Sequence, residues 1–135
     1  MNRLRGKIIE IETNGNISLV TIEAEQTRFS STVIDTAESA SYLEVGGDIY
    51  MVFKETEMAI GKNLSGGLSL RNRFASTVTA IELGKVLAKV EIDFKGHRLH
   101  SIITARSARN LDLKVGDHVE GIVKTTEISL MEITG

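Results

Sequence analysis

One short segment of the sequence combines residue types that can hold an anion at the start of a helix. Thr104 is a suitable N-cap residue, and Ser107 follows three positions later, where its N–H and hydroxyl face the same point. No carboxylate stands at that third position, so the unpaired N–H groups of the first turn stay free for a ligand. Taken alone, the segment favours a plainer interpretation, an ordinary N-cap with a solvated first turn.

A second group with anion-binding chemistry lies earlier in the chain. Ser69 and Arg71 are two residues apart, so in a strand their side chains share one face. The guanidinium of arginine presents a planar fork of N–H donors that suits an oxyanion. Without further context, the pair describes an exposed edge strand with a solvated arginine.

The remaining reactive side chains do not form a convincing catalytic or metal site. His97 and His100 are three apart on an expected strand, so they point to opposite faces, and His118 falls in an expected turn. The chain has no cysteine, and it lacks a glycine-rich phosphate loop, a nucleophile elbow and a paired-carboxylate motif. We therefore expect no catalytic residues, no metal ligands and no enzyme activity.

Composition argues against nucleic acid and membrane as partners. The 135 residues carry 16 Lys and Arg against 18 Asp and Glu, a formal net charge of -2, and aromatic residues make up only 4%. A nucleic-acid binder needs a basic surface and, for single strands, aromatic stacking platforms. No apolar run approaches the ~18 residues of a membrane span, and residues 1–6 do not begin a secretory signal. We expect a cytoplasmic protein.

The chain contains an internal duplication. Asn2-Arg3-Leu4 recurs as Asn72-Arg73-Phe74, and at the same offset of 70 residues Lys54 falls on Lys124. Each unit is small for a stable core of its own, so pairing of units or of whole chains is expected. The predicted organisation is a first domain at residues 1–61 (the first repeat), a glycine-rich linker at 62–67, and a second domain at 68–135 (the second repeat).

Both repeats have mainly the periodicity of strands. Residues 86–94 alternate apolar and polar side chains, and Asn14-Gly15 between two apolar runs is a strong hairpin signal. One segment in each repeat, 35–43 and 104–113, begins with a capping residue and predicts a short helix. The expected fold is all-β, with two tandem OB-type five-stranded Greek-key barrels, each with one short helix.

The second repeat resembles the Mop, or molbindin, domain, a TOBE-type module. The resemblance rests on Ser69-Leu70-Arg71-Asn72-Arg73, Thr104-x-x-Ser107-Ala108, Leu111-x-Leu113-x-Val115-Gly116-Asp117 and Ile122-Val123-Lys124-Thr125-Thr126. The tandem arrangement resembles a di-Mop protein. It implies OB-type barrels that bind molybdate or tungstate between subunits, for cytoplasmic storage, homeostasis or sensing of the oxyanion, with no catalytic cofactor.

The same resemblance implies a set of oxyanion-binding residues. They are Ser69, Arg71, Asn72, Thr104, Ser107, Ala108, Lys124 and Thr125. Because the family's sites lie between subunits, the residues around Arg71 and Lys124 are expected to face Thr104 of another repeat or chain. The implied assembly is a homotrimer of tandem chains, with a dimer as the second choice.

The first repeat departs from this motif. Arg71 aligns with Met1, so the Ser and Arg of the motif are missing, and Asp35 and Glu38 together resemble a capping box whose carboxylates would repel a dianion. A local shift of register would instead make Ser39-Ala40 the counterpart of Ser107-Ala108. The weaker candidate site of the first repeat therefore consists of Lys54, Ser39 and Ala40.

The net charges of the two repeats also favour an anion site in the second repeat. Residues 1–67 have a net charge of -4 and residues 68–135 a net charge of +2. Our hypothesis is that the second repeat retains the main site. Two alternatives stay open: an OB-type module for binding protein or nucleic acid, and the effector-binding half of a molybdate-responsive regulator.

Overall fold

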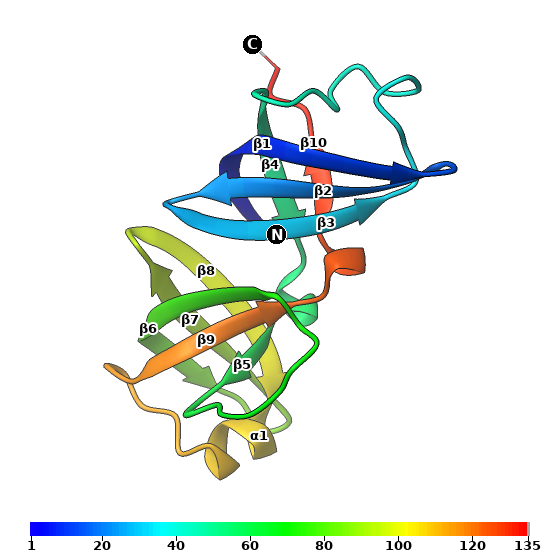
Figure 1. Ribbon diagram of the computed structural model, residues 1–135. Helices are drawn as coiled ribbons and strands as arrows, with labels where there is room; N and C mark the ends of the chain where they lie inside the picture. The colour runs from blue at the N-terminus through cyan, green and yellow to red at the C-terminus, as the bar shows by residue number, and fades with distance from the viewer. Residues whose placement is uncertain (135) are drawn as a thin grey trace.

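Two curled five-stranded antiparallel sheets form most of the chain in the computed structural model, which describes residues 1–134 (Figure 1). The first sheet has the order β10-β4-β1-β2-β3 and consists of β1 (Asn2–Asn14), β2 (Ile17–Ala24), β3 (Thr27–Val33), β4 (Asp48–Phe53) and β10 (Ser129–Met131). The second has the order β5-β9-β6-β7-β8 and consists of β5 (Ala59–Gly61), β6 (Asn72–Leu83), β7 (Leu87–Phe94), β8 (His97–Thr104) and β9 (His118–Val123). Two short helical segments, η1 (Glu55–Glu57) and η2 (Thr125–Glu127), connect the sheets, and α1 (Ala105–Asn110) lies between β8 and β9.

The strands follow the alternation of the sequence. In β7, Ala88, Val90, Ile92 and Phe94 are buried, while the residues between them are exposed or half-buried. Asn14 is the last residue of β1 and pairs with Ile17, so the β1–β2 hairpin turns at Gly15-Asn16. Gly15 has a φ of 65°, a conformation that glycine adopts without steric cost. The expected all-β fold with two five-stranded units is therefore confirmed.

Each sheet takes one edge strand from the other repeat. β10, at the end of the second repeat, pairs with β4 through Ser129 opposite Val52. β5, at the end of the first repeat, pairs with β9 through Ile60 opposite Gly121. The ranges 1–61 and 68–135 thus mark the sequence duplication, whereas the sheets divide the chain differently.

Two buried asparagines join the sheets in a symmetric way. The Asn72 side chain donates to the Ser30 carbonyl over 2.9 Å and accepts from the Ser30 N–H over 2.7 Å. The Asn2 side chain makes the same two bonds with the backbone of His100, both at 2.8 Å. Each amide therefore pairs like a short piece of strand with β3 or β8, the edge strand of the opposite sheet.

The hydrophobic core is continuous across both sheets. Phe29 of β3 stacks on Phe74 of β6 with ring centroids 4.4 Å apart, and Phe94 meets Phe74 edge-on at 5.2 Å. These rings are fully buried within one cluster that draws side chains from both repeats. Neither repeat alone is large enough to bury such a core, so the shared core is what makes the small units stable.

The helix expected at residues 35–43 is wrong: that segment forms a series of turns. The Asp35 carboxylate accepts from the Tyr42 hydroxyl at 2.9 Å instead of capping a helix. Thr36 and Ser39 bond each other's backbone N–H groups through their hydroxyls, an alternative to helical hydrogen bonding. The helix expected at 104–113 is confirmed as α1, the one α-helix among residues 1–134. None of the helices in that part of the chain has the length and apolar character needed to cross a membrane.

Candidate anion-binding site

Thr104 and Ser107 come together as the sequence predicts. Thr104 ends β8 and is the N-cap of α1, its Oγ1 accepting from the Ser107 N–H at 3.0 Å. The two hydroxyl oxygens are 2.8 Å apart, and both residues are exposed. Ala105 and Ala108 are buried, so they anchor the helix while its first turn faces outward. We call Thr104, Ser107 and Ala108 the helix-start group.

Contrary to the sequence-based expectation, the N–H of Ser107 is not left free, because it donates to Thr104 Oγ1. An incoming anion would therefore meet the two hydroxyls first. A hydroxyl can rotate to donate, so the pair can offer O–H donors to a ligand without unfolding the turn.

Cations surround the helix-start group. An open hollow of about 320 Å³ beside it is lined by Lys85, Val86, Thr104, Arg106 and Arg109. The lining holds three basic side chains and no carboxylate, so its electrostatic potential favours an anion. Sequence reasoning missed Lys85, Arg106 and Arg109 as site residues. The signal was available, because Arg106 and Arg109 are three apart and lie on neighbouring positions of a helix surface.

The other predicted residues gather at the opposite end of the second sheet. Asn72, the first residue of β6, pairs with Val123, the last residue of β9. Arg71, just before β6, and Lys124, just after β9, therefore lie at the same end of the sheet. Thr125 begins η2, and its hydroxyl is 3.1 Å from the hydroxyl of Thr32 in β3. We call Ser69, Arg71, Lys124 and Thr125 the strand-end group.

One chain does not bring these two groups into a single pocket. Arg71 precedes β6, whereas Thr104 pairs with Leu87, just beyond the far end of β6. β6 has 12 residues, which span about 40 Å at roughly 3.3 Å per residue when extended. Figure 1 shows the same separation: α1 lies at one extremity of the molecule and η2 lies between the two sheets.

The Asn72 side chain is not accessible to a ligand. Its residue is 0% exposed, and both its amide oxygen and its amide nitrogen bond the backbone of Ser30. In this structure the residue joins the sheets. This structural role explains why the asparagine recurs in the first repeat as Asn2, although the Ser and Arg of the motif are missing there.

The first repeat contains a copy of the helix-start geometry. Thr36 Oγ1 accepts from the Ser39 N–H at 3.2 Å, as Thr104 does from Ser107. The local register shift therefore applies, with Ser39-Ala40 in place of Ser107-Ala108, and Thr36 is a residue that sequence reasoning missed. The adjoining hollow is lined by Thr13, Gly15, Thr36, Ala37 and Glu38. It contains a carboxylate and no cation, so its charge opposes anion binding.

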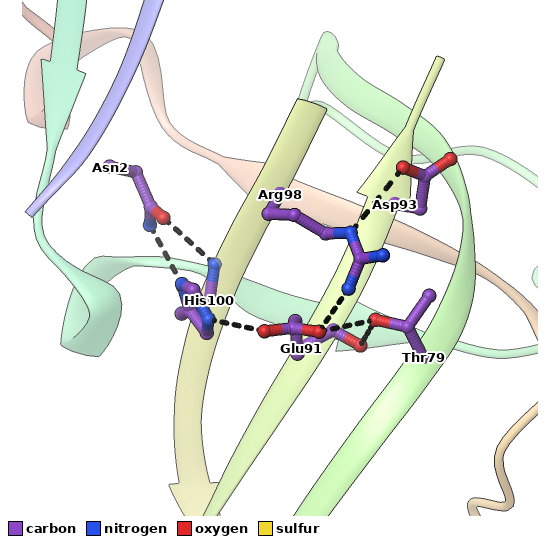
Figure 2. Close-up of polar contacts among 6 residues, drawn as sticks. All are labelled: Asn2, Thr79, Glu91, Asp93, Arg98 and His100. Atoms are coloured by element: carbon purple, nitrogen blue, oxygen red, sulfur yellow. Dashed lines mark hydrogen bonds and ion pairs between the residues drawn. The ribbon is translucent and has the colours of Figure 1, made fainter. Parts of the chain in front are cut away.

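A separate polar network braces the outer face of the second sheet (Figure 2). The Glu91 carboxylate accepts from Arg98 at 2.6 Å, from Thr79 at 2.8 Å and from the His100 ring at 3.0 Å. Hydrogen bonds from Thr79, His100 and Arg98 lower the pKa of Glu91 to about 2. A carboxylate held ionised in this way joins β6, β7 and β8, and it is poorly suited to proton transfer near neutral pH.

The chain is similar to several known proteins that handle molybdenum. Residues 68–130 match the TOBE domain. Across 129 residues the chain is 30% identical to the molybdenum import ATP-binding protein ModC of Brucella abortus (strain 2308), covering 90% of this chain and 36% of ModC. It is 33% identical over 86 residues to the molybdenum transport protein ModE of Azotobacter vinelandii, covering 63% of this chain and 30% of ModE. The chain thus spans about a third of these curated relatives.

A solved structure matches nearly the whole fold. The cytoplasmic molybdate-binding protein ModG, in a crystal form with molybdate bound, superposes with a TM-score of 0.86 and 27% sequence identity. The match covers 96% of this chain and 94% of that one. The expected tandem OB-type architecture is therefore confirmed along both repeats.

Proposed function

We propose that this chain, whose residues 68–130 match the TOBE domain and whose two repeats have the tandem arrangement of Mop-type proteins, binds molybdate reversibly and without catalysis. The observation that carries the proposal is the cationic hollow at the helix-start group, where Lys85, Arg106 and Arg109 line the space beside Thr104, whose hydroxyl lies 2.8 Å from that of Ser107. Three positive charges and two rotatable hydroxyls match the needs of a tetrahedral dianion. The ModG structure, which has molybdate bound, supports the choice of ligand.

Each site is formed between copies of the chain in this proposal. The strand-end group supplies Arg71 and Lys124, and the helix-start group of another copy supplies the hydroxyls. Apolar side chains support such a contact, since Leu83, Val86 and Leu87 are 53%, 72% and 54% exposed, and Val86 also lines the hollow. A homotrimer is the assembly we propose, and a dimer is the second choice.

Tungstate belongs to the same proposal. Molybdate and tungstate are dianions of nearly the same size, so the same donors serve both. The role we propose is cytoplasmic storage or homeostasis of the oxyanion. The similarity to ModE supports sensing as a second candidate, in which the chain is the effector-binding part of a regulator.

Isothermal titration of the purified chain with molybdate, tungstate, sulfate and phosphate tests the proposal. We expect heat with the first two anions and none with the others, and the stoichiometry gives the number of active sites per chain. Sedimentation velocity on the same samples gives the assembly. Absence of heat and of any thermal shift with molybdate and tungstate overturns the proposal and turns attention to protein partners.

A further inference from the structure

A lysine of the linker braces the loop behind α1. Lys62 follows β5 directly, and its Nζ donates to the carbonyl oxygens of Leu111 at 3.0 Å and Asp112 at 2.9 Å. The same Nζ forms an ion pair with Asp117 Oδ2 at 3.0 Å. Three acceptors satisfy the three N–H bonds of the ammonium group, and the side chain is only 22% exposed.

The partners of Lys62 belong to the end of α1. Leu111 is the C-cap residue, and Asp112 has a φ of 50°, a left-handed conformation that residues other than glycine rarely adopt. Carbonyl groups at the end of a helix lack partners within it, and a cation there also complements the helix dipole. α1 has six residues and a length of about 9 Å at 1.5 Å per residue. Holding one end of so short a helix therefore fixes the other, where Ser107 lies.

The first repeat lacks the same brace. Glu132 and Gly47 stand 70 residues from Lys62 and Asp117, at the corresponding places of the duplication. A glutamate carboxylate cannot donate to helix carbonyls, and glycine has no side chain to pair with. In that repeat the segment at 35–43 forms turns rather than a helix. Within the residues that the structure describes, the helix, the lysine and the aspartate thus occur together in one repeat only.

We propose that Lys62 is a positioning residue for the helix-start group. The inference rests on the proposed function, because it names the residue that holds Thr104 and Ser107 where an oxyanion can bind. The position of Lys62 is set by β5, which ends one residue earlier at Gly61, where it pairs with Glu120 of β9. The end of the first repeat thereby sets the geometry of the anion-binding group of the second.

The test compares Lys62→Met with Lys62→Arg and Lys114→Met. Methionine keeps the apolar stem and removes the ammonium, and arginine restores a cationic donor. Lys114→Met is the matched control, since Lys114 lies in the same loop and pairs only with Asp112, the two side chains being 70% and 74% exposed. Molybdate affinity is measured by titration below the unfolding temperature of every variant. Amide hydrogen exchange at Leu111 and Leu113, whose N–H groups bond Ser107 and Ala108, is followed without anion.

We expect Lys62→Met to weaken molybdate binding about tenfold and to speed exchange at both amides by a similar factor, the equivalent of one charge-assisted hydrogen bond. Lys62→Arg should recover most of the affinity, and Lys114→Met should stay within about twofold of the original chain. Unchanged affinity in Lys62→Met overturns the inference and leaves the proposed function standing. Absence of binding by the unaltered chain overturns the proposed function itself, and the inference with it.

Discussion

Charge at individual positions distinguishes the two repeats. The second repeat places Arg71 and Lys124 at one end of its sheet and Lys85, Arg106 and Arg109 at the other. The first repeat has the same backbone turn at Thr36 and Ser39, but its hollow holds Glu38 and no cation. An arginine or lysine can neutralise a dianion, whereas a carboxylate repels it. In our proposal, the residues that differ between these otherwise similar turns decide where an anion binds.

Replacing one cationic residue in each repeat tests this asymmetry. Arg71→Glu should abolish molybdate binding, because it replaces an exposed guanidinium with a like charge facing the dianion. Lys54→Ala, at the corresponding end of the first repeat, should change the affinity by less than about twofold. Calorimetric titration of both variants gives the comparison. Equal losses of molybdate affinity in the two variants would contradict the hypothesis that the second repeat retains the main site.

The Glu91 network predicts how stability depends on pH. Hydrogen bonds from Thr79, His100 and Arg98 lower the pKa of this carboxyl from its ordinary 4.5 to about 2. Because the folded-state pKa is the lower one, the stabilisation is fully present above pH 4.5 and is lost as the pH falls towards 2. Glu91→Gln should therefore lower the free energy of unfolding at pH 7 and have much less effect near pH 2. Urea unfolding at the two pH values measures this, and an equal effect at both would contradict it.

Two short elements, α1 and the turns at residues 35–43, show how one sequence pattern has two outcomes. Both begin with a threonine whose hydroxyl accepts from the backbone N–H of a serine three residues later. α1 continues as a helix, with Ala105 and Ala108 packed into the core and Lys62 at its end. In the first-repeat segment Ala37 is exposed, Ala40 is only half-buried, and Glu132 stands at the place of Lys62. The hydroxyl bonds therefore close a turn, and no helix follows.

Removing each threonine hydroxyl separates its structural role from its proposed binding role. Thr104→Ala should cost about 1 kcal/mol of stability through loss of the N-cap, and it should also weaken molybdate binding. Thr36→Ala should reduce stability to a smaller extent and leave molybdate affinity unchanged, since its hollow lacks cations. Thermal unfolding and titration of both variants provide the readouts. A loss of affinity in Thr36→Ala as large as in Thr104→Ala would show that the first repeat binds as well.

At the scale of the whole molecule, the two repeats form one interlocked structure. Each sheet borrows one edge strand, β10 or β5. Its opposite edge strand, β3 or β8, is bonded by an asparagine from the other repeat, and one cluster of phenylalanines spans both sheets. The length of a single repeat explains this arrangement, because about 65 residues bury too little apolar surface to be robust alone. The linker at 62–67 consequently does not separate two independent domains.

A fragment of residues 68–135 should not behave as a stable monomer. In it β9 lacks β5, and β10 lacks its partner β4, so two sheet edges are unpaired. We expect the fragment to associate by exchanging β10 between copies, with an unfolding temperature that rises with protein concentration. Sedimentation equilibrium and thermal scans at several concentrations measure this. A monomer whose unfolding temperature is independent of concentration would contradict the interlocked description.

The sequence by itself determined the features that depend on neighbouring residues. Alternation of apolar and polar side chains predicted the strands, the glycine turns predicted the hairpins, and Thr104 with Ser107 predicted the start of α1. The duplication also followed from residues that recur at a fixed offset, whereas the grouping of Arg71 with Lys124 came from the resemblance to the Mop domain. The strands, the hairpins and the start of α1 are local features, because hydrogen bonds and side-chain faces within a few residues fix them.

Only the tertiary structure decided the features that depend on distant partners. The exchange of β5 and β10, the use of Asn72 on Ser30, and the contact of Lys62 with the end of α1 join residues 40 or more positions apart. Asp35 was expected to cap a helix, but its carboxylate accepts a hydrogen bond from the Tyr42 hydroxyl instead. The sequence states which groups can donate and accept, but which of them meet depends on how the sheets curl and pack against each other.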